Sequence, residues 1–350
     1  MSDRARHGEL TEAPPQVTPG QAARIVRQLY GLPGEMRALQ GERDANFHLR
    51  HADGRAFMVK FINAAEPAQV SDFQLAMLRH IAREDSGLPV PAVISSLNGD
   101  AQPQADIGDG RLRLRVVSYL AGIPQSQATP GAPLMRHLGR TLARLDRALA
   151  GFSHAGARRA LLWDVSRSDQ ALPYLSFMRD GDQRRVAGQV LERFAQHVRP
   201  RLAALRQQVI HNDLNPHNVL VQEQDNGKVA GVIDFGDALQ APLIGDLATA
   251  LAYQLSDGDD MLAFVRPFIA AYHRELPLRE EEVALLPDLL AARMALTITL
   301  TQWRATLYPH NRDYILRNLP RCWRSLQRLL ACAPQDSAAR LWQCCRQERG

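Results

Sequence analysis

The sequence is poor in lysine, cysteine and aromatic residues. Arginine supplies nearly all of the 42 basic residues, and the only lysines are Lys60 and Lys228. The formal net charge is +5, yet no basic block is longer than a pair such as Arg158–Arg159. Proteins that bind nucleic acid gather their basic residues into a patch or stripe. We therefore expect no nucleic-acid partner, and each lysine becomes a candidate for a specific role.

Long apolar runs and Cys-x-x-Cys motifs are also absent. The longest apolar stretches, such as Ala291–Leu300, are interrupted by Arg or Thr and fall short of the roughly 18 residues of a membrane span. Residues 1–7 are polar, unlike the apolar core of a secretory signal. The four cysteines lie within 322–345 without the Cys-x-x-Cys spacing of a zinc site. We therefore expect a cytoplasmic protein with reduced thiols, no zinc and no membrane contact.

The composition that remains is that of a globular protein. The 350 residues are 45% hydrophobic and 23% charged, and a length of this size predicts about two lobes at roughly 150 residues each. Residues 1–17 lack a periodic apolar face, so we expect a mobile tail there. The lobes are predicted at 18–117 and 123–350, joined by a hinge at 118–122.

The first lobe has the pattern of a small antiparallel sheet with helices. Thr18 followed by proline predicts a helix start, and the helical spacing continues to about Tyr30. The dipeptide Asp53–Gly54 between two alternating apolar runs predicts a hairpin. Further strands are expected at 90–95 and 111–119.

The second lobe reads as mostly helical, with helices expected near 134–149, 172–178, 185–207 and from 246 to the end. One interruption stands out, because short strands at 219–221 and 229–233 flank an Asp-Asn-Gly turn. The fold class is therefore α+β, with a β-rich lobe before a helical lobe that contains a small hairpin.

Polar residues gather at both ends of that hairpin. The segment His211–Asn218 has the pattern H-x-D-x-x-x-x-N, and Asp234–Gly236 reads D-F-G. A hairpin folds back on itself, so its two ends should be neighbours. Phosphoryl transfer needs a group that orients or deprotonates the attacking hydroxyl, oxygen ligands for Mg²⁺, and a cation on the phosphates. We assign Asp213 as the base and Asn218 with Asp234 as the Mg²⁺ ligands.

Lys60 is the candidate for the cation. It lies on an apolar strand, 57–62, where a buried charge is costly without a partner or a ligand. Contact with nucleotide phosphates would remove that cost. A carboxylate on the following helix, Asp72, could hold the ammonium as an ion pair, and Glu66 is the competing candidate.

At these residues the chain resembles the aminoglycoside phosphotransferase/choline kinase family, which has the two-lobed protein-kinase-like fold. The resemblance covers nearly the whole chain. More narrowly, it resembles hydroxylysine kinases and the kinase domains fused to class III aminotransferases. The segments that carry this closer resemblance are Glu42–Phe47, Ser71–Gln74, Leu142–Asp146, Gly151–His154, Leu162–Asp164 and Ile210–Asp213.

The resemblance implies further roles around a bound nucleotide. Lys60 would contact the α- and β-phosphates, and Asp246 would cap its helix and brace the catalytic loop. The backbone of the hinge would read the purine edge, and two apolar residues would form the floor under the base. The hinge residues are Val117, Ser118, Tyr119 and Leu120, and the floor residues are Leu220 and Ile233.

Two departures from the kinase patterns narrow the acceptor. The loop Gln40–Phe47, expected over the phosphates, has one glycine and not the G-x-G-x-x-G of protein kinases, which matches the small-molecule branch better. Asn215 and His217 replace the His and Gly common in antibiotic kinases, which disfavours an aminoglycoside.

Other polar and aromatic residues have two interpretations each. His211 is better explained as a loop-holding residue than as a proton carrier. Asp237 either caps the next turn or contacts substrate or metal. Asp164 and Trp303 either line the acceptor pocket or pack between helices, and an ammonium-bearing acceptor would suit an acidic group beside an aromatic face.

The sequence thus predicts a kinase that uses Mg²⁺ with ATP or GTP and phosphorylates a small molecule bearing a hydroxyl and an amine. Hydroxylysine is the leading acceptor. Homoserine, choline or ethanolamine, an aminoglycoside and a protein serine are alternatives on the same fold. A nucleotide-binding pseudokinase is the alternative from another class, and the intact set of Lys60, Asp213, Asn218 and Asp234 argues against it.

Overall fold

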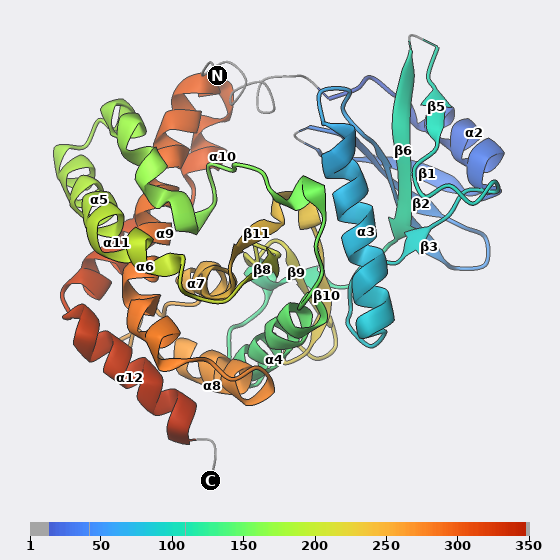
Figure 1. The fold of residues 1–350 in the computed structure, drawn as a ribbon. Coiled ribbons are helices and arrows are strands. Elements are labelled where there is room, and N and C mark those ends of the chain that lie inside the picture. The colour runs from blue at the N-terminus through green and yellow to red at the C-terminus, as the bar shows by residue number, and fades with distance from the viewer. Residues whose placement is uncertain (1–13, 42, 109, 348–350) are drawn as a thin grey trace. The chain divides into compact units, whose positions relative to one another are not determined.

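A computed structural model describes residues 14–41, 43–108 and 110–347. The chain forms two compact units that divide between Ala121 and Gly122, inside the predicted hinge segment (Figure 1). Residues 1–13 of the predicted tail, Glu42 of the predicted phosphate loop and residues 109 and 348–350 lie outside the described residues.

Unit 1 is an antiparallel sheet with two helices, in the strand order β1-β2-β3-β6-β4, with β5 paired to β6. The elements are α2 (Pro19–Tyr30), β1 (Glu35–Leu39), β2 (Ala45–Arg50), β3 (Ala56–Phe61), α3 (Ala68–Glu84), β4 (Val93–Ile94), β5 (Gln104–Asp106) and β6 (Arg111–Ser118). The strand expected at 90–95 is therefore shorter than predicted, and the hairpin at Asp53–Gly54 is confirmed by the pairing of β2 with β3.

The first helix begins and ends where the sequence predicts. The Thr18 hydroxyl accepts a hydrogen bond from the Gln21 amide at 3.3 Å, and the Gln21 side chain accepts one from the Thr18 amide at 2.9 Å. This reciprocal pair is a capping box, which satisfies amides that a helix start leaves without partners. At the other end, Gly31 takes a left-handed φ of 66°, which glycine adopts without steric cost.

Strand alternation places Lys60 away from the main core of unit 1. Phe57, Val59 and Phe61 of β3 are buried and belong to a cluster that also contains the buried face of α2. Neighbouring side chains in a strand point to opposite faces of the sheet. Lys60 therefore lies on the other face, beside Arg115 of β6, with which it is in register.

Unit 2 is mostly helical. Its elements are β7 (Ile123–Pro124), η1 (Gln125–Gln127), α4 (Ala132–Ala148), η2 (Ala155–Ala157), η3 (Val165–Phe177), α5 (Gly181–Arg193), η4 (Phe194–Val198), α6 (Arg199–Leu202), β8 (Gln207–Ile210), β9 (Val219–Val221), β10 (Val229–Val232), η5 (Phe235–Asp237), β11 (Leu239–Pro242), α7 (Leu243–Ala252), α8 (Val265–Glu275), α9 (Glu280–Leu307), η6 (Pro309–Asn311), α10 (Arg312–Leu316), α11 (Leu319–Leu330) and α12 (Pro334–Gln347). An antiparallel sheet followed by helices confirms the predicted α+β fold.

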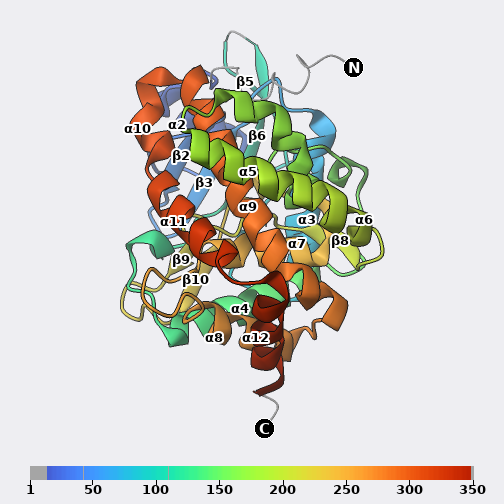
Figure 2. The same cartoon turned by 90° about the vertical axis from the view of Figure 1, so that its left-hand side faces the viewer.

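Helix α9 is the central helix of unit 2. It packs against η3, α5, α7, α11 and α12 (Figure 2). Its length and apolar composition would suffice to cross a membrane, but 83% of that apolar window is buried inside the structure. This is the packing of a core helix. Elsewhere in the unit, α4 and α8 pack so closely that a Cβ at Gly139 would lie 2.1 Å from the Phe268 carbonyl oxygen, so only glycine fits there.

One helix prediction was too long. The helix expected at 185–207 ends as α5 at Arg193, continues as a π-helical turn and a short α6, and stops at Leu202. Pro200 lacks a backbone N–H, and its ring would clash with the carbonyl four residues earlier in a regular helix. This explains the wider turn before it. Gln207 instead begins β8, which pairs with β11.

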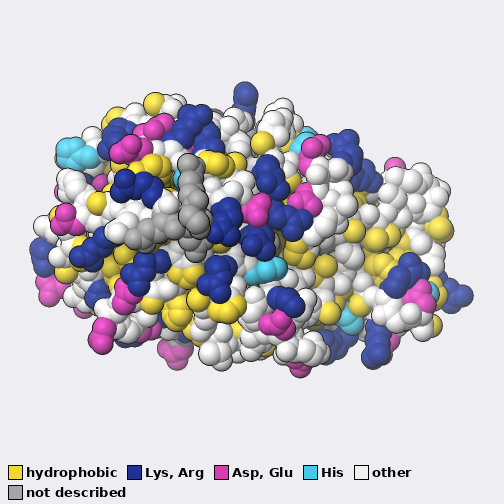
Figure 3. Space-filling model, turned by 90° about the horizontal axis from the view of Figure 1, so that it is seen from below, with side chains coloured by type: hydrophobic (Ala, Val, Ile, Leu, Met, Phe, Trp, Pro, Cys, Tyr) yellow, Lys and Arg dark blue, Asp and Glu magenta, His cyan; other side chains and the backbone are white. Residues whose placement is uncertain are grey.

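The surface agrees with the diffuse charge of the sequence. On the face drawn in Figure 3, Lys and Arg side chains are interspersed with Asp and Glu.

Candidate active site

The loop after β8 carries the H-x-D motif, and a buried carboxylate from α7 holds its backbone. Asp246 accepts hydrogen bonds from the amides of His211 at 2.9 Å and Asn212 at 2.8 Å, one with each carboxylate oxygen. Asn212 takes a positive φ of 67°, a conformation that non-glycine residues rarely adopt. The two hydrogen bonds to Asp246 therefore hold this strained backbone in place immediately before Asp213.

Asp246 is itself supported by buried groups. Asp146 of α4 lies behind it, and the Tyr272 hydroxyl donates to Asp146 Oδ2 at 2.6 Å. Burial raises the pKa of both carboxyls, and the charge of Asp246 raises that of Asp146 further. The brace of the catalytic loop is thus part of the core of unit 2.

His211 holds the loop through both ring nitrogens. Its Nδ1 accepts from the Asp213 amide at 3.2 Å, and its Nε2 lies 3.2 Å from the Ile233 carbonyl oxygen. A backbone N–H can only donate and a carbonyl oxygen can only accept. The pattern therefore requires the neutral imidazole ring with its proton on Nε2. The side chain is fully buried, and the geometry suits the loop-holding interpretation.

The Asp213 carboxylate is held at three points. Asn215 and Asn218 donate to Oδ2 at 2.9 and 2.7 Å. Arg293 of α9 donates to Oδ1 at 3.3 Å. The side chain keeps 22% of its surface exposed, so it can meet a substrate while its direction is fixed by neighbours.

The electrostatic environment makes Asp213 more basic than an ordinary aspartate. Burial and the nearby carboxylate of Asp237 raise its pKa, the guanidinium of Arg293 lowers it, and the net result is a pKa of about 7. The charge of Asp234 acts in the same direction as Asp237. A carboxylate whose pKa lies near neutrality is suited to accept a proton from a hydroxyl.

The hairpin brings the two candidate metal ligands together. The Ile233 amide donates to the Asn218 carbonyl oxygen at 2.9 Å, and Val219 pairs with Val232 in the β9–β10 ladder. Asn218 and Asp234 are therefore each next to this junction. Asp234 is exposed, has a φ of 61°, and accepts from the Gly236 amide at 3.1 Å.

The donor set at this junction fits magnesium. The Asn218 side-chain nitrogen faces Asp213, which leaves its amide oxygen for a cation, and Asp234 adds a carboxylate. Mg²⁺ binds typically through one or two protein oxygens, with phosphates and waters completing its shell. No group of three or more His, Cys, Asp or Glu with metal-binding geometry occurs among the described residues, so an all-protein metal cage is not formed there.

The cation of unit 1 has a different partner from the one predicted. Lys60 Nζ lies 3.4 Å from Asp44 Oδ2, and the other Asp44 oxygen accepts from the Asn63 amide at 2.9 Å. The prediction of Asp72 or Glu66 as partner is corrected: Asp72 is exposed on α3, and the charge of Glu66 acts on the neighbouring Arg115. Asp44 reaches Lys60 from the segment before β2, inside the predicted phosphate loop.

Helix α3 turns a different set of polar residues toward the sheet. Gln74 and Ser71 accept from the buried guanidinium of Arg115 at 2.7 and 2.8 Å. Lys60 and Arg115 lie on the same face of the sheet, so α3 is tied to this face through Arg115 and not through Lys60.

The predicted hinge backbone is partly used within unit 1. The Ser118 amide donates to Ala92 and the Tyr119 amide to Ala56. The Tyr119 side chain is 39% exposed, and its ring packs edge-on against His48. Two of the predicted hinge amides are therefore occupied by bonds within unit 1.

The predicted floor and support residues are placed as follows. Leu220 is buried on β9, and Ile233 lies at the hairpin junction. The backbone oxygen of Asp237 accepts a hydrogen bond from the Asn212 side chain at 3.2 Å. The charge of the Asp237 carboxylate raises the pKa of Asp213. Asp237 therefore belongs to the neighbourhood of the site.

Asp164 and Trp303 have packing roles in this structure. Asp164 is 2% exposed and caps η3 by accepting from the Ser166 amide at 2.8 Å and from its hydroxyl at 2.6 Å. Trp303 is 3% exposed, with its ring 4.5 Å from that of Tyr174. Both side chains are therefore occupied in the interior of unit 2.

The sequence interpretation missed the contact between Arg293 and Asp213. Arg293 donates to the Trp163 carbonyl oxygen at 2.7 Å and to the Tyr253 hydroxyl at 3.2 Å, and its guanidinium lies 5.6 and 5.8 Å from the centres of these two rings. An arginine inside the apolar stretch 291–300 was the available signal, because such a charge needs buried partners.

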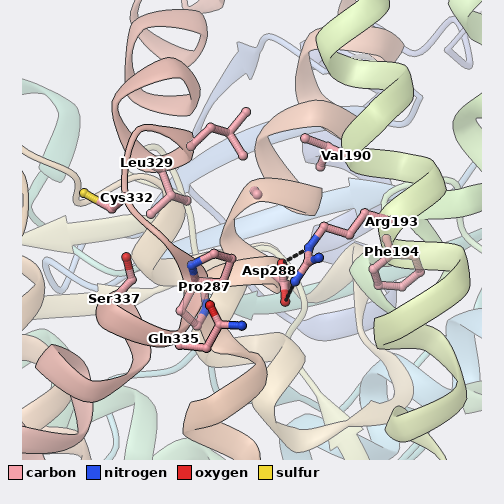
Figure 4. Close-up of a pocket in the computed structure, with 12 residues that line it drawn as sticks. Val190, Arg193, Phe194, Pro287, Asp288, Leu329, Cys332, Gln335 and Ser337 are labelled. Carbon is pink, nitrogen blue, oxygen red and sulfur yellow. Dashed lines mark hydrogen bonds and ion pairs between the residues drawn. The ribbon is translucent and has the colours of Figure 1, made fainter.

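A cavity of about 340 Å³ also occurs in unit 2, away from the catalytic loop. Its lining comes from α5, the π-helical turn, α9 and the α11–α12 region, and the ion pair of Arg193 with Asp288 crosses it (Figure 4). None of its lining residues belongs to segment 211–218 or 234–237, so it is not part of the candidate active site.

Comparison with known proteins agrees with this geometry. The model of the APH phosphotransferase enzyme family matches residues 35–285, which include Lys60, Asp213, Asn218 and Asp234. The chain belongs to this family. It is a phosphotransferase, and its fold is the protein-kinase-like fold predicted from the sequence.

Relatives of this family member carry more specific names. A hydroxylysine kinase of Danio rerio is 27% identical over 95% of this chain and 96% of its own length. A homoserine kinase of Methylobacillus glycogenes is 31% identical over 73% of this chain and 77% of its own. An amicoumacin kinase solved with AMP-PNP and Ca²⁺ matches with a TM-score of 0.63 at 17% identity, over 83% of this chain and 91% of its own.

Proposed function

We propose that this phosphotransferase moves the γ-phosphoryl group of ATP or GTP to the hydroxyl of a small hydroxy amino acid, with hydroxylysine as the leading acceptor. The observation that carries the proposal is the near full-length similarity to hydroxylysine kinases. The intact set of Lys60, Asp213, Asn218 and Asp234 supports turnover as opposed to a nucleotide-binding pseudokinase.

The proposed reaction is a single in-line transfer. The acceptor oxygen forms a bond to the γ-phosphorus, the bond from that phosphorus to the β–γ bridging oxygen breaks, and the nucleoside diphosphate leaves. The proton of the acceptor hydroxyl goes to the Asp213 carboxylate. Because Asn215, Asn218 and Arg293 fix the direction of that carboxylate, the hydroxyl would be oriented before transfer.

Two sets of residues would act on the nucleotide. Asn218 and Asp234 would hold Mg²⁺, which when bound neutralises charge on the phosphates. Lys60 would contact the α- and β-phosphates, and its side chain keeps 30% of its surface exposed. The Leu120 amide would meet the purine, and Leu220 with Ile233 would lie under the base.

The acceptor class is supported by the charges beside Asp213. Quaternary ammonium groups are recognised by aromatic faces, but the rings of Trp163 and Tyr253 already have the Arg293 guanidinium over them. This disfavours choline. The carboxylate of Asp237, whose charge acts on Asp213, favours an acceptor that carries an ammonium group.

Homoserine is the second candidate. It shares the amino-acid group with hydroxylysine, and homoserine kinases reach 31% identity with this chain. We propose the cytoplasm as the compartment, where ATP is available and cysteine thiols stay reduced; cell fractionation tests this.

The test is mass spectrometry of products from purified protein with Mg²⁺ and either ATP or GTP. The panel contains hydroxylysine, homoserine, choline, ethanolamine, kanamycin and a serine peptide, with Asp213→Asn as the control protein. Phosphohydroxylysine made by the wild type alone would support the proposal. Phosphohomoserine would keep the mechanism and replace the acceptor, and nucleotide binding without any product would favour the pseudokinase.

A further inference from the structure

Arg293 lies in the middle of the central helix of unit 2 and is 2% exposed. Burying a guanidinium is costly unless it is paired and hydrogen-bonded. Here Nη1 binds the Trp163 carbonyl oxygen, while Nη2 lies between the Tyr253 hydroxyl and Asp213 Oδ1. The charge is therefore fixed at one end by the core and directed at the other end to the carboxylate of the catalytic loop.

The two oxygens of Asp213 have separate partners. Both amides on Oδ2, from Asn215 and Asn218, belong to the same loop as Asp213. Arg293 is the contact on Oδ1 and comes from 80 residues further along the chain. The two contacts from the loop hold Oδ2 alone, so without Arg293 the carboxylate could rotate about them. The contact of Arg293 with Oδ1 opposes that rotation.

We infer that Arg293 is the positioning residue of the Asp213 carboxylate, fixing Oδ1 so that the group faces the acceptor hydroxyl. The inference rests on the proposed role of Asp213 as the base. In this role Arg293 acts on the transfer step alone, since its hydrogen bonds go to Asp213, Trp163 and Tyr253 and not to the candidate metal ligands.

The test compares Arg293→Met and Arg293→Lys with a matched variant, Arg115→Met. Arg115 is an arginine of unit 1 that is 7% exposed and is held by Gln74 and Ser71. For Arg293→Met we expect kcat to fall about 10- to 100-fold, the loss typical of a misplaced catalytic group, with the Kd for the nucleotide within about twofold of wild type. Arg293→Lys should recover part of kcat, because an ammonium can still meet Oδ1.

A double-mutant cycle separates positioning from general loosening of the fold. In the Asp213→Asn background, Arg293→Met should lower the residual rate no further, because its effect passes through the carboxylate. A full additional loss there, or an equal loss in Arg115→Met, would overturn the inference.

A readout that needs no acceptor distinguishes failure of this inference from failure of the proposed function. In a crystal structure of Arg293→Met, the Asp213 carboxylate should rotate while the backbone of segment 211–218 stays in place. A carboxylate found in its original position would contradict the positioning role whatever the enzyme phosphorylates.

Discussion

The two units bury an arginine in opposite ways. Arg115 of unit 1 is held by the oxygens of Gln74 and Ser71, which are neutral. Burial lowers the pKa of Arg115, and the more distant carboxylates of Glu66 and Asp44 only partly offset this. Burial acts in the same direction on Arg293 of unit 2, but Tyr253 and Asp213 beside it raise its pKa above the ordinary value.

The two buried arginines therefore differ in role, because Arg115 connects a helix to the sheet and Arg293 contacts the candidate active site. In unit 1 the buried cation joins α3 to the sheet, and the cation available to a ligand is a separate residue, Lys60, which is 30% exposed. In unit 2 the buried cation directly contacts Asp213, the proposed base. Removing charge should therefore affect stability in unit 1 and turnover in unit 2.

The largest effect is expected from Asp213→Asn, which removes the anion of the unit 2 pair. An amide cannot accept the proton of the acceptor, so kcat should fall about 10²- to 10⁴-fold, the usual contribution of a general base. Nucleotide affinity, measured by calorimetry, should change by less than about threefold, because the phosphate contacts come from other residues. Equal loss of turnover and nucleotide binding would show that Asp213 is not the base.

A smaller effect is expected from Asp44→Asn, which removes the anion beside Lys60, the half-buried cation of unit 1. Lys60 would lose the carboxylate that holds it 3.4 Å away, and the Asn63 amide would keep an oxygen acceptor. Because ion pairs near the surface contribute about 1 kcal/mol or less, we expect the nucleotide KM to rise about fivefold at most, with kcat nearly unchanged.

Asp72→Asn is the matched control for that variant. Asp72 is an exposed carboxylate on α3, and its loss should leave the nucleotide KM within about twofold of wild type, as is usual for surface substitutions. A larger rise for Asp72→Asn than for Asp44→Asn would restore the helix carboxylate as the partner of Lys60 during turnover.

How much of this could be predicted depended on distance along the chain. The H-x-D and D-F-G segments sit at the two ends of one short hairpin, so their proximity follows from local sequence. The strands β8 and β11 that flank this region are four residues each, too short for periodicity to reveal. Their pairing joins segments about 30 residues apart and was not predicted.

The misplaced partner of Lys60 has a physical reason as well. The apolar spacing of α3 at Val70, Phe73 and Met77 sets which face is buried, and Asp72 falls outside it. Helical periodicity thus argued against Asp72. Asp44 carried no comparable signal, since a loop residue's direction depends on contacts such as the Asn63 amide. Arg293 was signalled by its apolar surroundings, but its partner came from a distant loop.

An effect on stability and not on turnover is expected from Arg115→Met, which removes the buried cation of unit 1 and keeps an unbranched apolar side chain. Gln74 would lose a hydrogen bond, while Ser71 would keep its bond to Gln102. Leaving buried acceptors without donors costs about 1–3 kcal/mol, but the desolvated charge is removed as well. We expect the free energy of unfolding to fall by about 1–2 kcal/mol in urea titration, with kcat within twofold of wild type. A kcat loss as large as that of Arg293→Met would mean that both buried arginines serve turnover, and the division between packing in unit 1 and function in unit 2 would have to be abandoned.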